Sequence, residues 1–110
     1  MNDERIQKTK SAMEAAEHIP PAKKTELLGL LSKLKLAVGK VAQTHEEDAK
    51  SIARLIEASA HEATRKKKRP EVLKTVLRGL KQSVENFRSS HPELVAFVTE
   101  YSGFLSEMGL

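Results

Sequence analysis

Five consecutive cations form the most conspicuous candidate binding site in this sequence of 110 residues. Further cations follow at spacings that place them on one outer face of a helix. Such a cationic surface can bind nucleic-acid phosphates, anionic lipid or an acidic protein. The candidate polyanion-binding residues are Arg65, Lys66, Lys67, Lys68, Arg69, Lys74, Arg78 and Lys81.

Two features of the composition weaken that interpretation. The net charge is +4, from 19 Lys and Arg against 15 Asp and Glu, and it becomes −1 when the run Arg65 to Arg69 is set aside. Stacking of nucleic-acid bases would require aromatic residues among the cations, and none are present there. The alternative interpretation is a solvated turn at the end of a helix, where the helix dipole favours cations.

The histidines and acids give no catalytic pattern. His61 and Glu62 begin like the zinc motif H-E-x-x-H, but Arg65 stands where the second ligand should be, so we interpret them as an ordinary pair on a helix surface. The acids after His45 are explained by the helix dipole alone. Cysteine, a Gly-x-Ser-x-Gly elbow and a phosphate-binding glycine loop are all missing. We expect no enzyme activity, no cofactor and no metal.

Apolar residues recur every three or four positions, which predicts an all-α protein. Pro21 and Pro70 suit the first turns of helices. Thr44 and Ser90 each begin an S/T-x-x-E capping box, so we expect both hydroxyls to cap helices. The prediction is a single helical domain over residues 1–110, with helices at about 3–17, 21–42, 45–64, 70–88 and 91–108.

The apolar stripes are symmetric about the two capping signals, near His45 and near Ser90. This symmetry predicts a small helical bundle of two antiparallel αα-hairpins plus an N-terminal helix. Glycines inside the helices, at Gly29, Gly79 and Gly103, suggest close contacts between helices.

Glu93, Glu100 and Glu107 form an acidic column on the last helix. It should not pair with the cations of the preceding helix, because the two columns occupy different edges of the antiparallel interface. The column is therefore left facing solvent, another helix or another subunit, and Lys33 and Lys40 on the second helix are possible partners. That helix also has a widened apolar face that includes Leu28, Leu30 and Leu36.

Four segments resemble a family of short, uncharacterised bacterial helical proteins: His61 to Arg65, Arg78 to Leu80, Ser90 to Leu94 and Leu105 to Leu110. The resemblance implies a bacterial, cytoplasmic, helical protein, and it assigns no site residues. The polar N-terminus, without an apolar secretion segment, favours the same location, and we expect no transmembrane segment.

The sequence leaves two functions open. The first is a non-enzymatic structural or interaction module that self-associates as a homo-oligomer or binds another protein, suggested by the widened leucine face and the acidic column. The alternative is an electrostatic binder of nucleic acid or another polyanion through the basic cluster.

Overall fold

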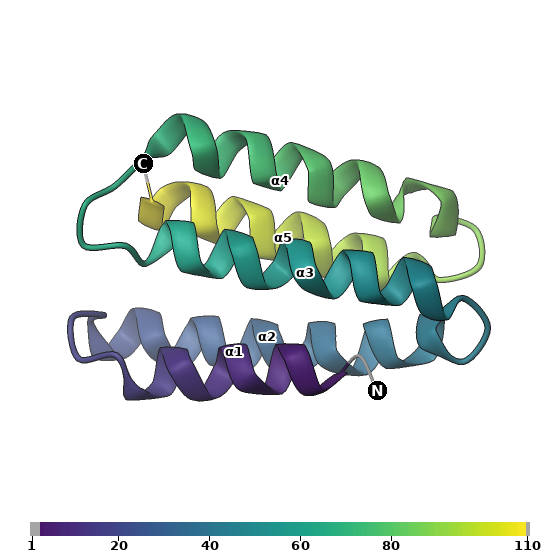
Figure 1. Cartoon of the computed structure of the whole chain (residues 1–110), viewed down its shortest axis with the longest axis horizontal. Coiled ribbons are helices and arrows are strands. Elements are labelled where there is room, and N and C mark those ends of the chain that lie inside the picture. The colour runs from purple at the N-terminus through teal and green to yellow at the C-terminus, as the bar shows by residue number, and fades with distance from the viewer. Residues whose placement is uncertain (1–2, 110) are drawn as a thin grey trace.

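Residues 3–109 are described by a computed structural model, and they form five α-helices and no strand (Figure 1). The helices are α1 (Asp3–Ala15), α2 (Pro21–Ala42), α3 (Glu46–Ala63), α4 (Pro70–Val84) and α5 (Pro92–Gly109), with a 3₁₀ turn, η1, at Glu85–Phe87. The predicted all-α class and the two hairpins plus an N-terminal helix are confirmed. None of the described helices is long and apolar enough to cross a membrane.

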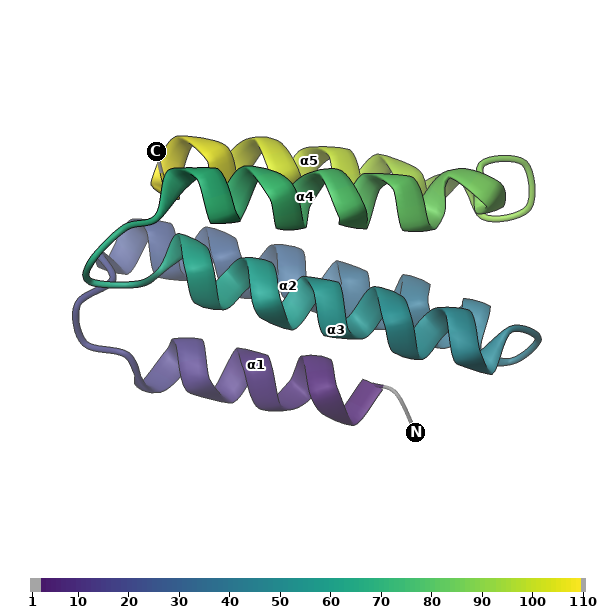
Figure 2. The same ribbon diagram turned by 45° about the horizontal axis from the view of Figure 1, so that its top comes forward.

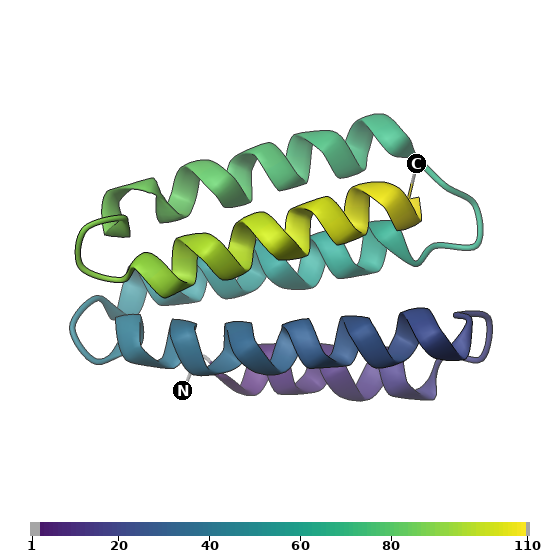
Figure 3. The same cartoon turned by 180° about the vertical axis from the view of Figure 1, so that it is seen from behind.

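The helices lie in three layers. Figure 2 shows α4 and α5 in one layer, α2 and α3 in the next, and α1 below them. Each helix runs antiparallel to the one before it, so α2 to α5 form an up-and-down four-helix bundle. From behind, α5 lies between α4 and α2 (Figure 3), and it contacts both. The remaining helix, α1, lies outside this four-helix bundle, where it contacts α2 and α3 and covers their far side.

The predicted apolar stripes form the core because residues three and four apart share one face of a helix. Leu34 and Val38 of α2 and Ile52 and Ile56 of α3 are fully buried. In α4 every fourth or third residue from Leu73 is buried: Leu73, Leu77, Leu80 and Val84. The alanines of α3 at positions 49, 53, 60 and 63 are also buried, and their small side chains permit close packing.

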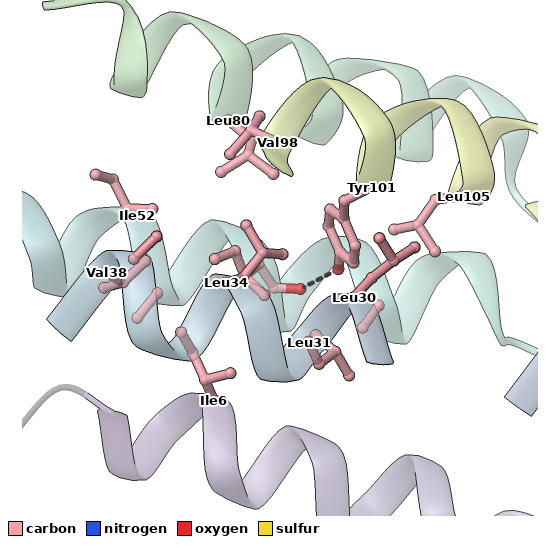
Figure 4. Close-up of a cluster of buried hydrophobic side chains, with 14 of the residues drawn as sticks. Ile6, Leu30, Leu31, Leu34, Val38, Ile52, Leu80, Val98, Tyr101 and Leu105 are labelled. Atoms are coloured by element: carbon pink, nitrogen blue, oxygen red, sulfur yellow. Dashed lines mark hydrogen bonds between the residues drawn. The ribbon is translucent and has the colours of Figure 1, made fainter. Parts of the chain in front are cut away.

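Tyr101 provides the one polar connection through the centre of the described core. It reaches from α5 toward α2 and α3 (Figure 4), and its hydroxyl donates to the Ile56 carbonyl at 2.9 Å. Ser59 lies 2.8 Å from the same hydroxyl and also donates to the Ile56 carbonyl. Burial raises the pKa of the Tyr101 phenol well above its usual value.

Both predicted capping boxes are wrong, because each helix begins later than the box requires. The N-cap of α3 is His45, and no side chain caps it. α5 begins at Pro92. The hydroxyls of Thr44 and Ser90 instead lie 2.8 and 3.1 Å from Nδ1 of His45 and His91.

His45 and His91, from two different connections between helices, contact the same aromatic ring. His45 and His91 both contact Phe87 edge-on, with ring centroids 5.3 and 5.8 Å away. Phe87 belongs to η1, because α4 tightens into a 3₁₀ turn after Val84 instead of continuing to residue 88 as predicted. This turn carries Phe87 into contact with both connections.

The widened leucine face of α2 is covered mainly from within the chain. Leu30 is buried and Leu28 half-buried, because α1, α3 and α5 surround this helix. Leu36 is the exception: it is 72% exposed and takes no part in the core.

The acidic column on α5 does not pair with the cations of α4, as the handedness argument predicts, and one of its members contacts α2. Glu100 lies 3.8 Å from the Lys33 ammonium, and no described ion pair joins this column to the cations of α4. Lys33 also lies 5.7 Å from the centre of the Phe97 ring. Lys40, the other predicted partner, makes no ion pair with a described residue.

The predicted close contacts at glycines are wrong for three positions. A methyl group added at Gly29 or Gly103 would meet no atom within 4 Å, and at Gly79 it would make only an ordinary contact with Leu55. The tight position is Gly109. There an added methyl would lie 2.4 Å from Leu73 Cδ2 and 3.2 Å from Ala63 Cα.

Candidate polyanion-binding surface

The basic run forms the connection between α3 and α4, at one end of the bundle (Figure 1). Pro70 starts α4 directly after it, since proline needs no hydrogen-bond partner in the first turn. Arg65 to Arg69 therefore come directly before α4, which carries the cations Lys74, Arg78 and Lys81 along its length. We call these eight residues the basic surface.

Glu62 holds the end of the run against α3. The guanidinium of Arg69 donates through Nε and Nη2 to the two carboxylate oxygens, at 3.1 and 2.5 Å. Arg65 Nε lies 3.8 Å from the same carboxylate. Glu62 is only 7% exposed, so its interpretation as a residue of the helix surface is wrong. His61 beside it is exposed, as expected.

The electrostatics of this pair follow from that geometry. The hydrogen bonds from Arg69 lower the pKa of Glu62, helped by the positive charge of Arg69 and of Arg65, while burial opposes the shift. The same pair raises the pKa of Arg69. One buried carboxylate therefore pairs with two of the five consecutive cations and offsets one of their two charges.

A third cation of the run completes the end of α3. Lys68 Nζ donates to the Ala63 carbonyl at 2.6 Å, and Arg65 Nε donates to the Lys67 carbonyl at 3.1 Å. The last carbonyls of a helix lack partners within the helix, and a cation there is favoured by the dipole. Arg65, Lys68 and Arg69 thus have structural partners, as the alternative interpretation of the run expects.

Lys66 and Lys67 differ from the rest of the run. Both are exposed, and neither side chain makes a hydrogen bond or ion pair with another described residue. Their charges therefore remain available to an outside anion.

The cations of α4 share a groove with α5. Lys74, Arg78 and Lys81 line a depression of about 250 Å³ together with Leu77 and Ser106. No Asp or Glu lines it. Arg78 and Lys81 make no ion pair with a described residue, and Lys74 makes only an exposed one, at 3.6 Å, with Glu71 of the same helix.

No group of three or more metal-ligating side chains occurs among residues 3–109. Comparison with known proteins finds no matching family model, no matching curated protein and no matching solved structure. The function must therefore be inferred from the residues of this chain.

Proposed function

We propose that this protein is a non-enzymatic helical module that binds polyanions through its basic surface. The observation that carries the proposal is the groove between α4 and α5, which three cations line without any carboxylate. Lys66 and Lys67 extend the positive charge beyond the end of α4. A phosphate backbone is a suitable occupant, because it offers regularly spaced negative charges and requires no base-specific contact.

The packing of the described residues gives less support to self-association. Most of the leucine face of α2 is buried by α1, α3 and α5, and Glu100 has a partner in Lys33 of the same chain. Among the described residues, the large apolar side chains that remain exposed are Leu36 and Val72, which lie on different helices. We also propose, from the sequence, that the protein belongs to a family of short bacterial helical proteins and is located in the cytoplasm.

The test is fluorescence anisotropy with labelled duplex DNA at several salt concentrations. If four or five phosphates are neutralised, log K should fall with log salt at a slope of about −4. Replacing Arg78 and Lys81 together with Gln should bring the slope to about −2, because two fewer counterions are released. The pair Lys66→Gln and Lys67→Gln should act alike.

The matched control replaces Lys40 and Lys50, which lie near the turn between α2 and α3 at the opposite end of the bundle. This variant loses the same charge and should keep the slope of the original protein. Arg69 is avoided, because its loss would leave the buried Glu62 without its partner. Absence of DNA binding at low salt, or equal slopes in all three variants, would refute the proposal.

A further inference from the structure

The ends of α1 and α3 lie on the same side of the bundle as the basic run (Figure 1). A second cavity is lined by residues from these segments. Its volume is about 440 Å³, within the range of about 300 to 1,000 Å³ typical of ligand pockets. Residues from α1, the α1–α2 connection, α3 and the basic run all line it. The groove between α4 and α5 shares none of its residues.

The cavity combines an apolar wall with nitrogen-bearing side chains. Met13 of α1 and Ala16, the first residue after this helix, provide the apolar wall. His18 and His61 approach from the two neighbouring segments, and Lys66 and Lys67 contribute two ammonium groups. No Asp or Glu lines the cavity, so an anion entering it would meet no carboxylate in the wall.

The helix ends around this cavity already have their partners. Lys24 Nζ donates to the Glu14 and Ala16 carbonyls at 2.9 and 2.5 Å, and Lys68 donates to the Ala63 carbonyl. His18 Nε2 donates to the Thr64 carbonyl at 2.5 Å, which fixes its ring at the cavity. The negative ends of α1 and α3 are thus neutralised by groups other than Lys66 and Lys67.

We propose that this cavity binds a small organic anion with an apolar body, such as an aryl phosphate. The apolar body would lie against Met13 and Ala16, and the phosphate would face Lys66 and Lys67. The apolar contact is essential to the proposal, because exposed ammonium groups alone bind inorganic phosphate weakly in water. This ligand class differs from a polyanion, which needs no apolar wall.

The test uses 1-naphthyl phosphate, titrated into the full chain and followed by two-dimensional amide NMR. Saturable shifts are expected at Ala16, His18 and Thr64 to Lys67. Inorganic phosphate and neutral 1-naphthol each supply half of the ligand. The affinity for each should be lower than that for naphthyl phosphate by about tenfold or more, because each lacks the contacts of the other half and losing a few modest contacts lowers affinity tenfold.

Variants locate the site and separate it from the groove between α4 and α5. The double variant Lys66→Gln with Lys67→Gln should lower the affinity for naphthyl phosphate by about tenfold. Lys40→Gln with Lys50→Gln should change nothing. Ala16→Trp should fill the cavity and abolish naphthyl phosphate binding while DNA binding persists, and Ala16→Leu serves the same purpose if the larger residue prevents folding. The double variant Arg78→Gln with Lys81→Gln should weaken DNA binding while naphthyl phosphate binding persists.

Three results would overturn the inference. The first is the absence of saturable shifts at millimolar naphthyl phosphate. The second is equal affinity for naphthyl phosphate and inorganic phosphate, which would show that the apolar wall contributes nothing. The third is unchanged affinity in the Lys66 and Lys67 double variant. Each can occur whether or not DNA binds, so failure of this inference is distinguishable from failure of the proposed function.

Discussion

Glu62 and Arg69 are joined by two hydrogen bonds, at 3.1 and 2.5 Å, across the turn that separates α3 from α4. The carboxylate is buried, and the guanidinium is half exposed. A buried carboxylate requires a partner, because its loss of hydration is costly. Arg69 is therefore part of the structure of the turn, whereas Lys66 and Lys67 are free to bind an outside anion.

The first prediction concerns acid stability. Because the pKa of Glu62 is lowered in the folded chain, the unfolded chain binds a proton first as the pH falls. The stability that the carboxylate contributes is present above about pH 4.3 and is lost as the pH falls through the lowered pKa. Urea unfolding should show Glu62→Gln less stable than the original chain at pH 7, with the difference shrinking toward pH 3. The exposed control Glu26→Gln should show no such trend, and an equal trend would contradict the assignment.

The second prediction concerns alkaline stability. The pKa of Tyr101 is raised in the fold, so the unfolded chain loses its phenolic proton first. Stability should hold up to about pH 10 and fall above it. Tyr101 is the only tyrosine, so phenolate absorbance reports this residue alone. Tyr101→Phe should cost about 1 kcal/mol at neutral pH and remove the contribution of Tyr101 to the alkaline loss. Phenolate appearing near pH 10 without unfolding would count against the prediction.

A third prediction compares two glycines of α5. Gly103→Ala should stabilise the chain by about 0.5 to 1 kcal/mol, because alanine is the better helix former and the added methyl meets open space. Gly109→Ala should instead destabilise it by about 1 kcal/mol or more, since the methyl collides with Leu73 and approaches the backbone of Ala63. Thermal unfolding of the two variants checks the signs. Equal effects would mean that α5 does not end against α3 as described.

The fourth prediction uses two apolar residues that a sequence pattern treats alike. Leu80 is fully buried between the layers, so Leu80→Ala should cost about 3 to 5 kcal/mol. Phe97 is half-buried at the edge of the core, with the Lys33 ammonium near its ring. Phe97→Ala should cost distinctly less, about 2 kcal/mol, because water already reaches part of the ring. If denaturant unfolding shows a larger loss of stability for Phe97→Ala than for Leu80→Ala, Phe97 does not lie at the edge of the core.

Periodicity predicted the helices and their inner faces, because burial of one face imposes the 3.6-residue repeat. Leu73, Leu77, Leu80 and Val84 could be identified in this way. Antiparallel geometry also excluded the cations of α4 as partners of the acidic column and left Lys33 as one possible partner, which lies 3.8 Å from Glu100.

What the sequence could not reveal depends on contacts between distant segments. Glu62 has the same local pattern as an exposed acid, and only the return of Arg69 explains its burial. His18 and Thr64 are 46 positions apart, and no local signal links them. The end cavity was missed for this reason. The exposure of Leu36 could not be predicted for another reason: the sequence of a helix face with many leucines does not indicate which of them stays exposed.

The up-and-down order of the helices also bears on how fast the chain folds. Each helix packs against the next one in sequence, so most of the bundle can form by closing short turns. Chains rich in such local contacts fold in microseconds to milliseconds, since little loop entropy is lost before contacts form. The contacts of α2 with α5 and of α1 with α3 span longer stretches of chain. We expect them to form late, with Tyr101 reaching the Ile56 carbonyl only when the layers dock.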